Sequence, residues 1–107
     1  MWTEKDKELV TRLLASTKAG KRDWLPTGER NEFATAMSGK YLVTIRQSRY
    51  TTEPTHYLDI TEVGGANLVT LGADEYPELA EMYELARRQA LKVDDAINDI
   101  LQDLGPD

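Results

Sequence analysis

Groups able to carry out acid–base or metal chemistry are few in this sequence. His56 is its single histidine, and it has no cysteine, so histidine pairs and thiolate sites are excluded. A general base needs a partner that orients it, and the candidates near His56 are Glu53, Thr55 and Asp59. A lone histidine beside a loop is more often a surface or packing residue. We therefore expect a protein that is not an enzyme and that holds no cofactor.

A second group with chemical potential lies near the C-terminus and consists of four carboxylates and one carboxamide. Oxygen ligands of this kind bind a divalent cation when a loop holds them around the ion. This set lacks the glycine-hinged spacing of a calcium loop, and acidic residues on the exposed side of an amphipathic helix are usually solvated. We therefore expect no metal site among these residues, which are Asp94, Asp95, Asn98, Asp99 and Asp103.

The segment TKAGKRDWLPTGER, residues 17–30, combines four basic residues with two glycines and a tryptophan. It lacks the G-x-x-x-x-G-K-[ST] spacing of a phosphate loop, and it follows an expected helix instead of connecting a strand to a helix start. Gly20 fits the end of that helix, and Pro26 with Gly28 fits a turn. We interpret Trp24 first as a residue that covers the edge of the core and only second as a stacking platform. The segment is therefore a structural joint before it is a binding loop.

Charge is distributed unevenly along the chain. The net charge is −6; residues 1–22 carry six basic and three acidic groups, whereas residues 72–107 carry three basic and ten acidic groups. An acidic chain is a poor ligand for DNA or RNA, because nucleic-acid binding requires a basic face. We expect the basic N-terminal part to complement the acidic C-terminal part, within one molecule or between two.

The sequence shows no targeting or membrane signal. It contains no apolar run that approaches the roughly 18 residues of a transmembrane helix. The first residues, MWTEKDKELV, show no apolar signal-peptide core, and the lack of cysteine is compatible with a reducing compartment. We therefore expect a cytoplasmic protein with no membrane partner.

Helical periodicity occurs at both ends of what we expect to be one α+β domain, residues 1–107. Residues 3–18 predict an amphipathic helix capped by Thr3, because their apolar residues recur three and four positions apart. Residues 76–104 show the same period, and their apolar stripe alone would permit one long helix. A cluster of basic residues followed by acidic ones favours two helices instead. The expected helices are 76–91 and 94–104.

Residues 31–71 have a period of two and predict a four-stranded antiparallel meander, with the helices packed on one of its faces. In the first hairpin, a three-residue loop places Phe33 opposite Ile45 and keeps the apolar residues on one face. In the last hairpin, we expect Gly64 and Gly65 to form a two-residue primed turn with positive φ. That turn would place Thr61 opposite Leu68.

The alternation of the strands assigns each residue to one of two sheet faces. The predicted buried face consists of Phe33, Met37, Tyr41, Val43, Ile45, Leu58, Ile60, Val69 and Leu71. The predicted outer face consists of Ala34, Ala36, Leu42, Thr44, Arg46, Tyr57, Asp59, Thr61, Leu68 and Thr70.

Three stretches together resemble a known group of proteins. They are LLASTKAGKRDW, the lone Phe33 before a strand hairpin, and LAEMYELARRQALKVDDAINDILQDL. A T-K-x-G-K-x-x-W-like segment after a leading helix, and an L-x-x-x-Y-x-x-A-R-R-x-A helix before an acidic last helix, are similar to a widespread group of small uncharacterised bacterial α+β proteins. The resemblance implies no transferable activity. It draws attention to Thr17, Lys18, Gly20, Trp24, Tyr83 and Arg87.

The shortage of catalytic groups and the sparsely charged outer face predict a non-catalytic interaction or regulatory module that self-associates or binds a protein partner. We expect the contact to form through the outer sheet face or the adjoining edge strand. The residues expected to form it are Leu42, Arg46, Tyr57, Asp59 and Leu68. The alternative is a binder of a small anionic or planar ligand, using guanidinium and aromatic groups. The residues of that alternative are Trp24, Arg46, Arg49, Tyr50 and Tyr57.

Overall fold

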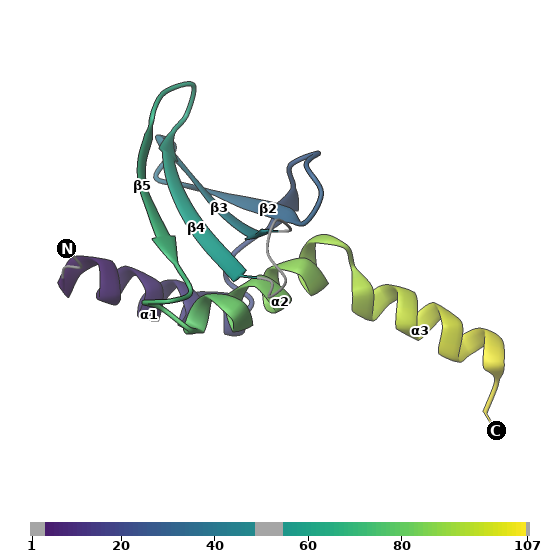
Figure 1. The fold of residues 1–107 in the computed structure, drawn as a ribbon. Coiled ribbons are helices and arrows are strands. Elements are labelled where there is room, and N and C mark those ends of the chain that lie inside the picture. Colours follow the sequence, from purple (N-terminus) through teal and green to yellow (C-terminus); the bar gives the residue numbers. More distant parts are fainter. Residues whose placement is uncertain (1–3, 49–54, 107) are drawn as a thin grey trace.

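The fold joins an N-terminal helix, an antiparallel sheet and two C-terminal helices, as seen in a computed structural model that describes residues 4–48 and 55–106 (Figure 1). The predicted α+β class is therefore confirmed. Thr3, the expected helix cap, lies outside the described residues. Along the chain the elements are α1 (Glu4–Lys18), β1 (Leu25–Pro26), β2 (Glu32–Met37), β3 (Tyr41–Ser48), β4 (Thr55–Glu62), β5 (Asn67–Gly72), α2 (Glu78–Ala90) and α3 (Val93–Leu104).

The sheet has five strands within the described ranges, in the order β1-β2-β3-β4-β5. The prediction of four strands was wrong because it missed β1, whose Leu25 and Pro26 lie opposite Ala34 and Phe33. Both residues of β1 are exposed, and proline has no N–H to donate to a strand ladder. A strand this short, with no buried side chain, leaves no period-two pattern in the sequence.

The first hairpin has the predicted register. Phe33 of β2 lies opposite Ile45 of β3, and the pairs continue on both sides across a loop of residues 38–40. Ser38 and Gly39 in this loop have φ values of 58° and 67°. The loop therefore reverses the chain with two left-handed residues, a conformation that glycine adopts at little cost.

The loop of the last hairpin is longer than predicted. The N–H of Gly65 donates to the carbonyl of Glu62 at 2.8 Å, and the N–H of Glu62 donates to the carbonyl of Ala66 at 3.1 Å. These bonds enclose three residues instead of two. Gly64 has a φ of 72°, whereas Gly65 does not have a positive φ. The predicted primed turn with two left-handed glycines was therefore wrong.

A β-bulge in β5 compensates for the longer loop. Thr61 lies opposite Asn67, whereas Ile60 lies opposite Val69, so Leu68 is the extra residue between the two pairs. The predicted pairing of Thr61 with Leu68 was wrong, but the pairs beyond the bulge are those predicted from the sequence. Because a one-residue slip would turn Val69 away from the core, the bulge restores the register that burial requires.

The core lies between the sheet and two helices. α2 packs against β1 to β4, and α1 packs against α2 on the same side of the sheet (Figure 1). Most of the predicted buried face is confirmed: five of its nine residues belong to the core cluster, while Met37, Ile60 and Val69 pack around it partly buried. Tyr41 belongs to neither group, and Ala34 and Thr44, which were assigned to the outer face, are buried. The cluster consists of Val10, Leu13, Leu14, Trp24, Phe33, Val43, Ile45, Leu58, Leu71, Tyr76, Leu79, Met82, Tyr83 and Ala86.

The C-terminal region forms two helices, as the charge pattern predicted. Leu91 and Lys92 join them, and Lys92 adopts a left-handed conformation with φ 53° and ψ 46°. Nη2 of Arg88 lies 2.5 Å from Oδ1 of Asp94, so an ion pair links the end of α2 to the start of α3. The left-handed joint turns the chain between the two helices, and this exposed ion pair spans it.

α3 does not pack on the sheet, contrary to the prediction that all helices cover one face. It projects from the end of α2, away from the strands (Figure 1). None of its 12 residues, all of which the structure describes, is buried. The helix-covered side of the sheet is already occupied by α2, with α1 packed beside it. The amphipathic pattern of α3 therefore faces solvent in the single chain.

Candidate functional site

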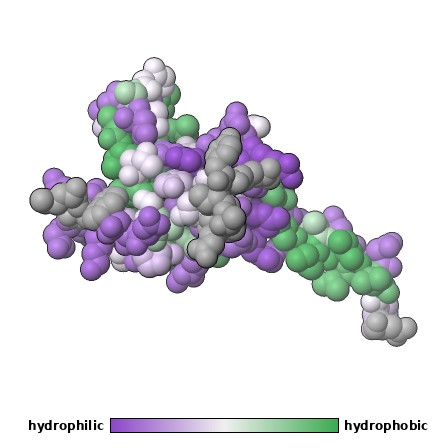
Figure 2. All heavy atoms as spheres, viewed as in Figure 1, coloured by the Kyte–Doolittle hydropathy of each residue, from purple (hydrophilic) through white to green (hydrophobic). Residues whose placement is uncertain are grey.

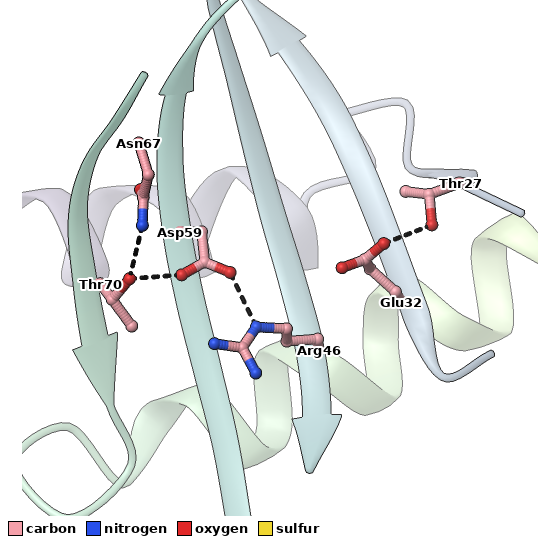
Figure 3. A network of polar contacts seen from close by, with 6 residues as sticks. All are labelled: Thr27, Glu32, Arg46, Asp59, Asn67 and Thr70. Carbon is pink, nitrogen blue, oxygen red and sulfur yellow. Dashed lines mark hydrogen bonds and ion pairs between the residues drawn. The ribbon is translucent and has the colours of Figure 1, made fainter. Parts of the chain in front are cut away.

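The outer sheet face, which is the face opposite α1 and α2, carries a network of polar contacts across three strands (Figure 3). Nε of Arg46 on β3 donates to Oδ2 of Asp59 on β4 at 2.8 Å. The hydroxyl of Thr70 on β5 donates to Oδ1 of the same carboxylate at 2.6 Å, and Asn67 donates to that hydroxyl at 3.0 Å. Asp59 is only 16% exposed, so these partners stabilise a carboxylate that has lost most of its water.

Tyr57 completes this network on the side of β5. The Cζ atom of Arg46 lies 4.7 Å from the centre of the Tyr57 ring, which is the geometry of a cation–π contact. A Cβ placed on Gly72, the residue opposite in β5, would lie 3.6 Å from the same ring. The ring therefore covers the glycine backbone, as aromatic residues do beside strand glycines. Three of the predicted site residues thus form one connected structural unit.

Two leucines are the exposed apolar groups predicted for this face. Leu42 on β3 is 37% exposed, and Leu68 at the bulge of β5 is 52% exposed. Arg49 and Tyr50, the other two residues of the ligand-binding alternative on this part of the chain, lie outside the described residues. The outer face therefore combines a polar centre, whose groups bond to each other, with isolated apolar residues. Such a face can also remain exposed to solvent.

Trp24 lies in the core, with 1% of its surface exposed. Its indole Nε1 donates to the hydroxyl of Thr17 at 3.1 Å, and its backbone N–H donates to Oε1 of Gln89 on α2 at 2.9 Å. The predicted structural role at the joint between α1 and the sheet therefore agrees with its position. A ring this deeply buried offers no face on which a ligand could stack.

His56 on β4 lies at the margin of the core. The centre of its ring is 4.9 Å from that of Tyr83 on α2, and its Nε2 is 3.4 Å from Nε2 of Gln47. Burial lowers the pKa of His56 below the ordinary value for histidine, and the nearby carboxylate of Glu84 opposes part of this shift. Asp59, which was one of its candidate partners, is instead bonded to Arg46 and Thr70. The surroundings of His56 are those of a packing residue.

Residues 4–48 and 55–106 provide neither a cluster of metal ligands nor a membrane-spanning helix. In these ranges no cluster of three or more histidine, aspartate or glutamate side chains could hold a metal ion. Nor does any helix within them combine the length and apolar character of a membrane span.

α3 carries an exposed apolar surface, although the sequence predicted that this helix packs on the sheet. Its apolar residues form one stripe along the helix, the α3 stripe, which is 42–70% exposed (Figure 2). The signal was present in the sequence as an apolar residue every three or four positions, but this pattern does not say which surface the stripe contacts. The stripe consists of Ile97, Ile100, Leu101 and Leu104.

In comparisons with known proteins, no family description, curated protein or solved structure matches this chain. The resemblance to small bacterial α+β proteins therefore stays a prediction. Function has to be argued from the surfaces of the chain itself.

Proposed function

We propose that this protein is a non-catalytic interaction module of the cytoplasm that self-associates. The observation that carries the proposal is the α3 stripe, because a 12-residue helix with four exposed aliphatic side chains has no packing partner within the described chain. Isolated helices of this length are marginal in water, and most helices in proteins gain their stability from a packed apolar face. A partner for the stripe would supply that packing.

The free energy gained by burying apolar side chains, set against the cost of association, favours a dimer in which two stripes are buried. An aliphatic side chain that goes from full exposure to full burial contributes about 1.5–3 kcal/mol, so one half-exposed stripe of four contributes on the order of 5 kcal/mol. Association costs about 4–15 kcal/mol in lost freedom of motion. One stripe reaches only the lower end of this range, whereas two stripes contribute on the order of 10 kcal/mol. A dimer in which each copy buries its own stripe is therefore favoured over a one-sided contact.

The outer sheet face supports self-association less strongly. Its central charges are already bonded to each other, and its exposed leucines do not form a continuous stripe on one element. The small-ligand alternative has less support again, because Trp24 is buried and Arg46 is held by Asp59 and Tyr57. Both remain hypotheses that the same experiment separates from the proposed one.

Light scattering on the full chain tests the proposal. We expect the wild type to have the mass of two chains and the variant Ile100→Glu with Leu104→Glu to have the mass of one. The matched control is Asn98→Glu with Gln102→Glu, which adds the same charge on the polar side of α3 and should leave the dimer intact.

The variant Leu42→Glu with Tyr57→Glu tests the outer sheet face, and loss of the dimer in this variant alone would place the contact on that face. A wild type that stays monomeric at high concentration would refute self-association.

A further inference from the structure

A groove beside α1 is a further surface with an apolar lining. It has a volume of about 600 Å³ and is open to solvent. Leu9 and Leu13 of α1, together with Met37 at the end of β2, form its apolar floor. We call this surface the α1 groove.

The rim of the α1 groove is basic. Lys5 and Arg12 extend from α1, and Arg22 extends from the segment that follows α1. Glu8 is the acidic residue at the rim, and it lies 3.4 Å from Arg12 in an ion pair whose two side chains are both exposed. Exposed pairs of this kind contribute little and exchange readily for another partner. The groove therefore offers an apolar floor inside a rim with a net positive charge.

α3 has the complementary character. Four aspartates and no basic residue lie within its sequence, VDDAINDILQDL. Of these aspartates, Asp103 lies at the border of the α3 stripe, whereas Asp99 lies on the polar side of the helix. The helix thus presents an apolar stripe next to negative charge, and the α1 groove presents an apolar floor next to positive charge. Charge complementarity of this kind fixes the partner and the register of an interface.

The position of the two surfaces excludes their contact within one molecule. α1 runs from the N-terminal end of the molecule to a position beside α2, whereas α3 projects from the other end of α2, away from the sheet (Figure 1). Only Leu91 and Lys92 join α3 to α2, and α2 is fixed in the core by Leu79, Met82 and Tyr83. A second copy of the chain is therefore the occupant that both surfaces fit.

We infer that α3 of one copy binds in the α1 groove of a second copy, with its stripe on Leu9, Leu13 and Met37 and with Asp103 near Arg12 and Arg22. This inference rests on the proposed function and names the surface that receives the α3 stripe. Each chain has one helix to donate and one groove to accept it, so a reciprocal exchange satisfies both and closes a two-fold dimer.

Charge reversal tests this pairing. The groove variant carries Arg12→Glu with Arg22→Glu, and the helix variant carries Asp103→Arg. In a homodimer of either variant, charges of the same sign meet at both contacts, and we expect the dissociation constant to rise at least tenfold. In a mixed dimer, the arginine-bearing helix meets the glutamate-bearing groove, and the native helix meets the native groove. An equimolar mixture should therefore form heterodimers with an affinity close to that of the wild type.

Sedimentation velocity of the wild type, of each variant alone and of the mixture gives distinguishable outcomes. Weak homodimers with a strong heterodimer support the inference. A dimeric wild type whose variants associate normally, or whose mixture stays monomeric, overturns the inference while the proposed self-association stands. A monomeric wild type overturns the proposed function itself. The variant Arg30→Glu with Lys40→Glu makes the same change of charge at exposed positions outside the groove and should behave like the wild type.

Discussion

The indole N–H of Trp24 donates a hydrogen bond to the hydroxyl of Thr17, with 3.1 Å between the two heavy atoms. The same hydroxyl donates to the carbonyl of Leu13, one turn earlier in α1, at 2.8 Å. A buried indole is thereby joined to the last turns of α1 across the basic segment between them. This contact explains why the segment of residues 17–30 is a structural joint.

Thr17→Val should destabilise the fold, because it leaves the N–H of a buried indole without its acceptor while keeping the shape of the side chain. The expected loss is about 1–3 kcal/mol in the free energy of unfolding, measured by urea denaturation. Thr11→Val makes the same chemical change at an exposed position of α1 and should cost much less. Equal losses in the two variants would contradict the role assigned to the Thr17 hydroxyl.

The contact between Arg46 and Asp59 should stabilise the fold more than an ion pair that is fully exposed to solvent. A double-mutant cycle with Arg46→Ala and Asp59→Ala should give a coupling energy of about 1–2 kcal/mol, because the carboxylate is largely desolvated and the bond is charge-assisted. The pair Glu8 and Arg12 on α1 is exposed on both sides and should give less than about 0.5 kcal/mol in the same measurement. Similar coupling for the two pairs would show that the outer-face network contributes no special stability.

Gly64 should be the sensitive glycine of the last hairpin, because its φ of 72° is unfavourable for other residues. We expect Gly64→Val to lower the free energy of unfolding by about 1–2 kcal/mol, and Gly64→Asn to lower it less, since asparagine tolerates this region better. Ala66→Ser, two residues further along, should be close to neutral in the same denaturation assay. A valine variant as stable as the serine variant would mean that the loop adapts to either residue.

His56 should make stability depend on pH in a defined direction. Because its pKa is lowered in the folded state, the unfolded chain binds a proton more readily between that pKa and about 6.5. The stabilising effect is present above this window and is lost as the pH falls through it. Thermal stability should therefore fall in the wild type as the pH drops below about 6.5, and the stability of His56→Gln should change less over the same range. A steeper loss in the variant would contradict the assigned burial of the ring.

Strand pairing was largely predictable from the sequence, because the alternation of buried residues determines the register. Phe33 pairs with Ile45 and Leu58 with Leu71, as the pattern required. The bulge at Leu68 was not predictable, since two different loop lengths lead to the same buried pairs once an extra residue is inserted. β1 was missed because its short strand has no buried side chain.

Placement of the helices was predictable only in part. The apolar stripes marked α1, α2 and α3, and the charges marked the break between the last two. The stripe of α3 is as regular as that of α2, yet only α2 faces the sheet. Periodicity reports that a helix has an apolar face, whereas the surface that covers this face depends on the space left by other elements. For the same reason, the sequence predicted a contact surface on the sheet, whereas the structure shows the exposed apolar stripe on α3.

Hydrogen exchange at increasing protein concentration tests the central claim most directly, because it locates association on the chain. We predict that the backbone amides of Val93–Leu104 exchange quickly in dilute solution, where α3 is unsupported, and become protected as the concentration rises. The amides of β3 in the core should show the same protection throughout, and Ile100→Glu with Leu104→Glu should remove the concentration dependence of α3. Exchange in α3 that is the same at every concentration would contradict self-association through this helix.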